Sequence, residues 1–401
     1  MDDLQRYLQS LGIPQPKREV NPHDPRSIQQ VPFPNATAIT NPYGLVYLIH
    51  ETFPTAGTLQ SRKVPPEILK WLGIETLVEN FVNEDFLFVD VETSGAYPGA
   101  GVICFLVGIG QLREDKIRLS QYLILHPEDE FAQLIELEKI FSTVKGLMTY
   151  NGKSFDLPLL QSRYQFHQIP LPTKNLLHID LLHLSRRIWK NHLPSRTLRT
   201  MEAHLLDIER SVDDIPGWMI PAIYRDFLVT WDASFLLPVL YHNKMDVFSL
   251  IHLYLYIAQL FVHPPTVSPD NAETVFQLAN FYQSIGESTK AINAYIACQS
   301  SLGGPSKIHL LENLALLYKK QKHFEEAVKA WQEAANLGSL NAHLELAKYY
   351  ERIKKDPIQA KLWVEAALTI LDTRKMDRFE RTKWQSELQY RLERINKSKT
   401  V

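Results

Sequence analysis

Two acidic residues, Asp90 and Glu92, stand two positions apart at the end of an apolar run, Phe86–Glu92. Alternate residues of a β-strand point to the same face, so a strand here places both carboxylates side by side. Paired acids on a buried strand are costly unless a cation neutralises them, and Mg²⁺ or Mn²⁺ prefers such oxygen ligands. The alternative is a strand that runs out into solvent, where the pair costs little. The pair therefore predicts either a metal site or an exposed strand end.

Two further acids stand where they can serve the same chemistry. Asp156 comes five residues after Asn151, between an expected strand and an expected helix, and as an alternative it caps that helix. His242 and Asp246 are four residues apart and precede a long apolar run. On a helix these two share one face, although taken alone such a pair is more often a surface ion pair.

The elements that must position these residues follow from hydrophobic periodicity. Three strand-like runs separated by Gly, Pro and charged residues indicate an antiparallel meander, and helix-like and short strand-like segments then alternate. The expected strands are 86–92, 102–110, 117–125, 146–150 and 176–180, and the expected helices between them are 128–141 and 157–166. This order predicts an α/β domain with a mixed sheet flanked by helices.

The order of the acidic motifs, D-x-E, then N-x4-D, then H-x3-D, resembles the four-acid (DEDD) superfamily of 3′–5′ exonucleases on the ribonuclease H-like fold. More narrowly, the chain resembles the YprB-type ribonuclease H-like proteins, to which the segment Leu198–Leu228 is also similar. The resemblance covers roughly residues 45–260. It implies two divalent metal ions, Mg²⁺ or Mn²⁺, that bind the scissile phosphate and activate a water.

Carried over by position, the family's acids fall on Asp90, Glu92, Asp156 and Asp246. Asp90 would then bridge both metals, Glu92 and Asp246 would hold the water-activating ion, and Asp156 the other. One branch of the superfamily has His five residues before the last acid, and another has Tyr four before it. This chain has Tyr241 at five and His242 at four. Helical phase favours His242 as the general base, because residues i and i+4 align.

A basic stretch lies between the second and third motifs. Five cations occur within fourteen residues that contain no acid: Arg186, Arg187, Lys190, Arg196 and Arg199. These cations are expected to bind the phosphates of single-stranded nucleic acid, with Trp189 beside them to stack a base. The alternative is that the stretch forms an exposed helix face. Asp180, at a strand end, is either a fifth acid near the site or a helix N-cap.

The last third of the chain repeats itself. The Leu-Ala pairs at 278, 314 and 346 recur 36 and 32 residues apart, each followed three residues after the Ala by a Tyr. This resembles tetratricopeptide repeats, over residues 272–371, with a basic capping helix over 374–399. Such repeats dock protein partners, and the family resemblance suggests a helicase-type partner.

Composition limits the remaining choices. The chain has 401 residues, and 43 basic against 45 acidic residues give a net charge of −2, so bulk charge does not draw it onto nucleic acid. Two cysteines exclude a disulfide framework and a multi-cysteine zinc site. We expect no membrane-spanning helix, no secretory signal and a cytoplasmic protein. The expected organisation is a proline-rich arm (1–44), an exonuclease domain (45–262), a linker (263–271) and the repeats (272–401).

The sequence thus predicts a metal-dependent 3′–5′ exonuclease that acts on single-stranded RNA or DNA. Two alternatives stay open. In the first, the protein is a scaffold whose repeats recruit a partner, and the nuclease-like domain is weakly active or inactive. In the second, the same domain cuts nucleic acid internally, which an end-blocked substrate would reveal.

Overall fold

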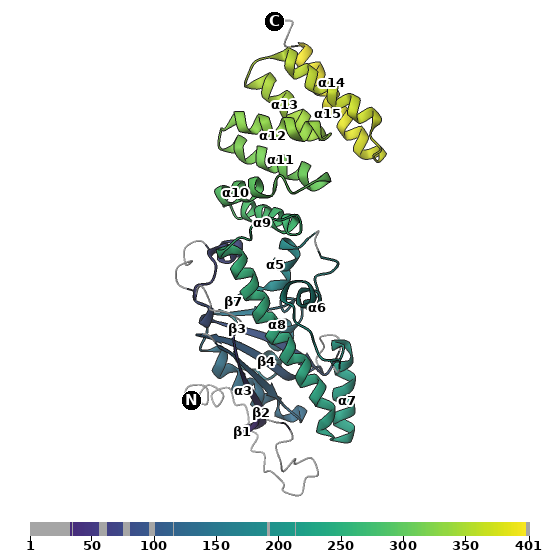
Figure 1. Cartoon of the computed structure of the whole chain (residues 1–401). Coiled ribbons are helices and arrows are strands. Elements are labelled where there is room, and N and C mark those ends of the chain that lie inside the picture. The colour runs from purple at the N-terminus through teal and green to yellow at the C-terminus, as the bar shows by residue number, and fades with distance from the viewer. Residues whose placement is uncertain are drawn as a thin grey trace. The chain divides into compact units, whose positions relative to one another are not determined.

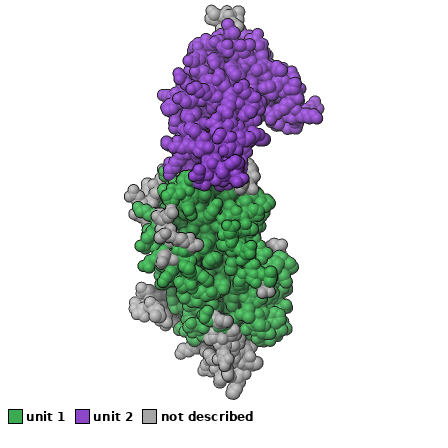
Figure 2. Space-filling model, viewed as in Figure 1, with its two compact units in different colours: residues 1–264 green, residues 265–401 purple. Residues whose placement is uncertain are grey.

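The structure is a computed structural model of the whole chain, and it describes residues 33, 35–55, 62–74, 81–95, 101–114, 116–190, 193–212 and 214–397. Most of the predicted N-terminal arm (1–44) lies outside these residues. The chain forms two compact units that divide after Pro264, within the segment predicted as a linker (Figure 2).

The first unit is built on a seven-stranded mixed sheet with the order β1-β2-β5-β4-β3-β6-β7. The first five strands in this order pair antiparallel, and β6 and β7 continue the sheet parallel to β3. The strands are β1 (Ala36–Asn41), β2 (Gly44–Pro54), β3 (Phe86–Thr93), β4 (Cys104–Arg113), β5 (Lys116–Leu123), β6 (Gly146–Thr149) and β7 (Leu177–Asp180). The predicted fold class, a mixed sheet flanked by helices, is confirmed. Strand β1 forms from residues that the sequence assigned to the arm.

Helices and short turns connect and cover the strands. The longer helices are α3 (Glu130–Phe141), α4 (Asp156–Phe166), α5 (Leu181–Ile188), α7 (Ile220–Thr230) and α8 (Leu237–Val262). Shorter helical pieces are α2 (Pro66–Trp71), η2 (Asn83–Asp85), η3 (Pro127–Asp129), α6 (Leu198–Met201), the π-turn η4 (Glu202–Leu206), η5 (Gly217–Met219) and η6 (Ala233–Leu236). The expected helices 128–141 and 157–166 correspond to α3 and α4.

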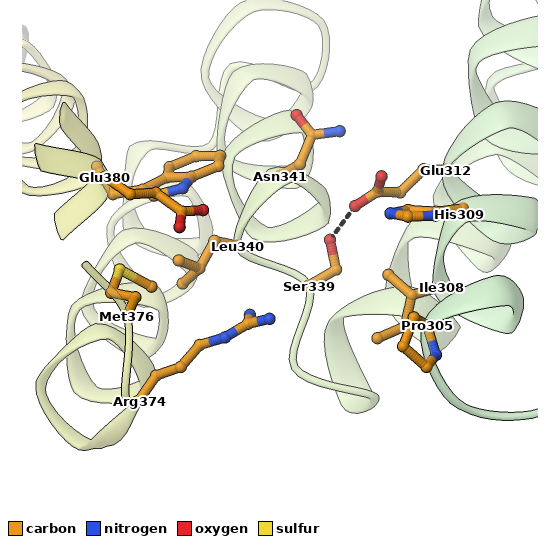
Figure 3. A pocket seen from close by; sticks show the side chains of 11 residues that line it. Pro305, Ile308, His309, Glu312, Ser339, Leu340, Asn341, Arg374, Met376 and Glu380 are labelled. Atoms are coloured by element: carbon orange, nitrogen blue, oxygen red, sulfur yellow. Dashed lines mark hydrogen bonds between the residues drawn. The ribbon is translucent and has the colours of Figure 1, made fainter.

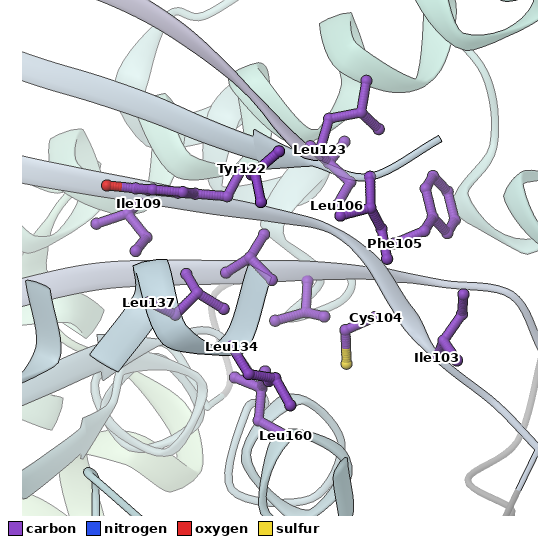
Figure 4. Packing of buried hydrophobic residues seen from close by; sticks show 14 of the residues in the cluster. Ile103, Cys104, Phe105, Leu106, Ile109, Tyr122, Leu123, Leu134, Leu137 and Leu160 are labelled. Carbon is purple, nitrogen blue, oxygen red and sulfur yellow. The ribbon is translucent and has the colours of Figure 1, made fainter. Parts of the chain in front are cut away.

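The core lies between the sheet and the helices on its face. Ile109 of β4 and Tyr122 of β5 belong to the same buried cluster as Leu134 and Leu137 of α3 and Leu160 of α4 (Figure 4). The apolar residues of α3 recur at helical spacing, which gives this helix one continuous face for burial. The sequences of the central strands are continuous apolar runs because these strands are covered on both faces of the sheet.

Helix α8 crosses the sheet and contacts β3, β4 and β5 (Figure 1). Two glycines of β4 allow this close approach. A Cβ atom at Gly108 would lie 2.3 Å from Asn243 Oδ1, and one at Gly110 would lie 2.5 Å from Ile251 Cδ1. By length and composition, Ala233–Val262 is apolar enough to cross a membrane, which the sequence analysis did not expect. Here half of its most apolar window is buried inside the structure.

The second unit is helical, as the sequence predicts. Helices pack in the pairs α9 (Ala272–Ser284) with α10 (Ser288–Cys298), α11 (Gly304–Lys320) with α12 (Phe324–Asn336), and α13 (Leu340–Arg352) with α14 (Pro357–Thr373). The three Leu-Ala pairs are all buried. Their identity as tetratricopeptide repeats stays a prediction.

The last helix, α15 (Arg378–Lys397), packs Leu388 and Ile395 against α13 and α14, with Trp384 and Leu392 partly buried beside them. A cavity of about 250 Å³ lies between α11, α13 and the start of α15 (Figure 3). Ser339 donates a hydrogen bond to Glu312 on its wall, and Arg374 and Trp384 line it as well.

Candidate active site

Asp90 and Glu92 lie near the end of β3, on the same face of the strand. Asn243 of α8 donates a hydrogen bond to Asp90 Oδ2 at 2.9 Å. Asn243 is in turn held by Gln121 of β5, whose Nε2 lies 2.9 Å from Asn243 Oδ1. Asp90 pairs across the sheet with Gly108, the residue that makes room for Asn243. A buried polar chain from β5 through α8 therefore fixes the orientation of Asp90.

Asp156 is brought to the same edge of the sheet by the loop that follows β6. Because β6 runs parallel to β3, the carboxyl ends of both strands meet there. Asp180, at the end of β7, accepts hydrogen bonds from the amides of Asn151 (2.8 Å) and Lys153 (3.1 Å) and caps α5 through Leu182. The N-cap interpretation of Asp180 is thus correct, and the same carboxylate also holds the loop that carries Asp156. Asp156 does not cap α4, because that helix begins at Asp156 itself.

His242 and Asp246 face each other on the first half of α8. His242 Nε2 lies 3.5 Å from Asp246 Oδ2, and His242 Nδ1 lies 2.9 Å from Asp214 Oδ1. Tyr241 points elsewhere, and its hydroxyl accepts a hydrogen bond from the amide of Ser211 at 2.7 Å. The helical phase of α8 therefore places His242, and not Tyr241, against the acids.

The four acids form one electrostatically strained cluster. Burial and the neighbouring carboxylates Asp246, Glu92 and Asp156 raise the pKa of Asp90 well above its usual range. Burial, then Asp246 and Asp156, does the same to the pKa of Glu92. Burial raises the pKa of Asp156 to about 7, although the amides of Asp156 and Val91 oppose the shift. Burial also raises the pKa of Asp246, against the effects of His242 and Arg210. Added positive charge would stabilise this cluster.

The residues fit a divalent metal by the chemistry of their donors. The cluster offers only carboxylate oxygens, which are buried at Glu92 and half-buried at the other three acids. Their charges repel one another, and hard divalent cations relieve such repulsion. Within the described ranges, no three His, Cys, Asp or Glu side chains are placed so that they could hold one metal ion together, so the side chains must move closer for an ion to bind. One of the acids already has a cationic partner, because Asp246 Oδ1 is bonded to Arg210.

Three residues of this site were missed by sequence reasoning: Glu202, Arg210 and Asp214. Arg210 binds Glu202 through two nitrogens, Asp214 at 3.3 Å, and Asp246. Hydrogen bonds from His242 and Arg199 hold the pKa of Asp214 below its usual range despite partial burial. All three lie in the segment Leu198–Leu228, but its helical pieces are short and Arg210 and Asp214 lie in the irregular stretch between η4 and η5, so no periodicity marks the inward-facing side chains.

The predicted nucleic-acid-binding cations divide into two groups. Arg186, Arg187 and Lys190 are exposed on or just after α5. Arg199 is engaged with Asp214, and Arg196 binds the backbone of Leu193 at 3.1 Å. The expectation that Trp189 stacks a base is wrong, because its side chain is fully buried and packs against Tyr256.

Two exposed aromatic residues are next in the chain to residues of the site instead. Phe155 immediately precedes Asp156 and is 51% exposed. Trp218 is 78% exposed, and its neighbour Gly217 approaches His242, since a Cβ atom at Gly217 would lie 3.5 Å from His242 Nε2. Large exposed aromatic surfaces beside a polar site are suited to stack planar ligands.

A mixed sheet with acids on its central strand, after the next parallel strand and on the helix across it defines a ribonuclease H-like α/β domain. The RNase_H superfamily model matches residues 87–258, which include all four acids. The chain is also 33% identical over 284 residues to the uncharacterized protein YprB of Bacillus subtilis (strain 168), across 69% of this chain and 68% of that protein. The chain belongs to the RNase_H superfamily, with YprB as a relative.

One solved structure shares a weaker likeness. It is the family B DNA polymerase from the hyperthermophilic archaeon Pyrobaculum calidifontis, at 12% identity and a TM-score of 0.34, over 59% of this chain and 29% of the polymerase chain.

Proposed function

We propose that this protein is a metal-dependent 3′–5′ exonuclease that hydrolyses phosphodiester bonds of single-stranded RNA or DNA. The observation that carries the proposal is the convergence of Asp90, Glu92, Asp156 and Asp246 into one partly buried, mutually repelling cluster beside His242. Divalent ions bound there would polarise the phosphate and lower the pKa of an attacking water. Members of the superfamily typically use such ions.

The protein residues contribute position and proton transfer. Asp90, Glu92, Asp156 and Asp246 would hold the ions, and Asn243 keeps the Asp90 carboxylate in place. The ionised Asp214 accepts a hydrogen bond from Nδ1–H of His242, so that in the neutral imidazole the lone pair is on Nε2, which faces the acids. In this tautomer Nε2 can take the proton of a water at the cluster, which is the role of a general base.

Substrate would approach over exposed cations and aromatic rings. Arg186, Arg187 and Lys190 offer positive charge to the phosphate backbone. The exposed Trp218, which follows Gly217 at the approach to His242, would offer a face on which the terminal base can stack. A free end reaches the recessed acids more easily than an internal bond in a duplex, which supports the preference for single strands.

The test is a cleavage assay on the full chain with 5′-labelled single-stranded RNA and DNA in Mn²⁺ or Mg²⁺. Asp90→Asn is the inactive control because it removes a ligand charge with little change of shape, and Asp226→Asn is the matched control on exposed α7. We expect a ladder that shortens from the 3′ end, absent in Asp90→Asn. A 3′-blocked substrate that is still cut would mean internal cleavage, and intact substrate with every metal would refute nuclease activity.

A second candidate rests on the helical unit. Its paired helices form an array of the kind that docks peptides, so the unit can recruit a protein partner such as a helicase, in the cytoplasm. If that is the whole function, Asp90→Asn leaves it intact. A complementation assay in cells that depend on this protein separates the two, because the exonuclease needs Asp90 and the adaptor does not.

A further inference from the structure

Arg210 is a buried cation that joins three carboxylates from three different segments. Its side chain is 6% exposed, and it binds Glu202 of η4, Asp214 of the following loop and Asp246 of α8. Nη2 is shared between Glu202 Oε1 and Asp246 Oδ1. A planar guanidinium with five donors suits this shared arrangement, whereas a lysine ammonium does not.

This contact links Arg210 to the proposed metal site. Asp246 is one of the four acids, and the oxygen bonded to Arg210 cannot at the same time offer its full charge to a metal ion. The positive charge of Arg210 also acts on Glu92, whose pKa it lowers against the larger opposing effects of burial and the acids. Arg210 therefore already supplies part of the positive charge that the cluster needs.

The surroundings of Arg210 allow its ion pair with Asp246 to break. It lines a cavity of about 590 Å³, together with Arg199, Glu202 and Asp214. Glu202 is buried and holds the guanidinium through two nitrogens, so Arg210 keeps a full ion pair when Asp246 leaves it. The ion pair between Arg210 and Asp246 can therefore break without leaving the buried Arg210 charge unpaired.

We propose that Arg210 is an internal counter-ion that competes with a divalent metal ion for Asp246 and thereby sets the metal affinity of the site. The proposal rests on the function proposed above. Arg210 holds the repelling acids together when no metal is bound, and metal binding requires Asp246 to exchange one cation for the other. Repulsion between Arg210 and the incoming ion acts in the same direction.

The test measures Mn²⁺ affinity of the full chain without substrate, from the electron paramagnetic resonance signal of free Mn²⁺. Arg210→Gln removes the competing charge and is expected to tighten Mn²⁺ binding about tenfold. Glu202→Gln removes the competing anion, leaves Arg210 more fully on Asp246, and is expected to weaken Mn²⁺ binding. Arg199→Gln is the control, because Arg199 touches Asp214 but none of the four acids.

Opposite shifts from the two variants support the competition, because a purely structural role for the network would weaken binding in both. Unchanged or weaker Mn²⁺ binding in Arg210→Gln overturns the inference and leaves the metal-dependent function standing. If Arg210→Gln does not fold, the direction of the Glu202→Gln shift decides, since tighter or unchanged binding there also overturns the inference. Wild-type protein that binds no Mn²⁺ refutes the metal site and the competition together.

Discussion

His242 is fixed at the site by Asp214, whose Oδ1 lies 2.9 Å from the imidazole Nδ1. Asp214 comes from the loop before η5, and His242 comes from α8, 28 residues later. Arg199 and Arg210 also bind Asp214, so the carboxylate is held in place and kept ionised. The pair therefore sets which ring nitrogen of His242 faces the acids.

The first prediction concerns this pair. His242→Ala should slow turnover by roughly 10²–10⁴-fold, the usual contribution of a general base, with Mn²⁺ affinity retained. Asp214→Asn should slow it by about 10–100-fold, because an amide no longer fixes the tautomer. Single-turnover kinetics of both variants and of the double variant measure this, and the two losses should not add. Tyr241→Phe is the control, and a larger loss there than in His242→Ala would assign the base to Tyr241.

The second prediction concerns the stability that the metal-free protein loses to repulsion among the four acids. Asp90→Asn removes one of several repelling charges, so it should raise the melting temperature of the metal-free protein by roughly 2–4 °C. The same variant should lose the stabilisation that Mn²⁺ gives the wild type. Thermal unfolding with EDTA and with Mn²⁺ tests both effects, with Asp226→Asn as control. A lower melting temperature in EDTA would contradict the repulsion argument.

The third prediction concerns the approach of α8 to the sheet. Gly108→Ala places a methyl group 2.3 Å from Asn243 Oδ1, which is buried and bonded to Gln121 and therefore cannot move freely. Overpacking of this kind should cost about 1–3 kcal/mol and displace Asp90 as well. Gly110→Ala meets Ile251 at 2.5 Å, farther along α8 from the acids. We expect both variants to lose stability in urea unfolding, but only Gly108→Ala to lose most of its activity. Equal activity in the two variants would mean that Asn243 does not position Asp90.

The fourth prediction concerns Trp218. Trp218→Ala should raise the KM for a single-stranded substrate by about 5–100-fold with little change in kcat, because base stacking contributes about 1–3 kcal/mol per base to binding. Val229→Ala, near the C-terminal end of α7 and 82% exposed, is the control for loss of exposed apolar surface. Steady-state kinetics on short oligonucleotides distinguish the two. An unchanged KM in Trp218→Ala would exclude stacking at this position.

The fifth prediction concerns pH. Burial, with a smaller effect of Lys153, lowers the pKa of His178 to about 4 from 6.5. The unfolded chain therefore binds a proton that the folded chain does not, between pH 6.5 and about 4. Stability should be complete above pH 6.5 and fall as the pH drops through this window. His178→Gln should flatten that slope in urea unfolding measured from pH 7 to pH 4, whereas His50→Gln, at an exposed histidine, should leave it unchanged.

The sequence by itself determined the order of strands and helices and the positions of the four acids. Period-two and helical patterns are local, so Phe86–Glu92 and the helix over 128–141 could be recognised without knowing their neighbours. The i, i+4 spacing of His242 and Asp246 likewise follows from the helix alone. Asp180 as an N-cap is local for the same reason.

Tertiary structure decided what surrounds those acids. Arg210 and Asp214 lie outside regular helices and strands, where no period indicates which side chains face inward, and they contact α8 across 36 and 28 residues. Glu202, in the short η4, joins the site through Arg210. The fully buried Trp189 and the exposed Trp218 show the same limit, because both are aromatic residues near basic or polar segments and only packing separates them. Charge and burial depend on distances between segments, and a linear pattern does not contain those distances.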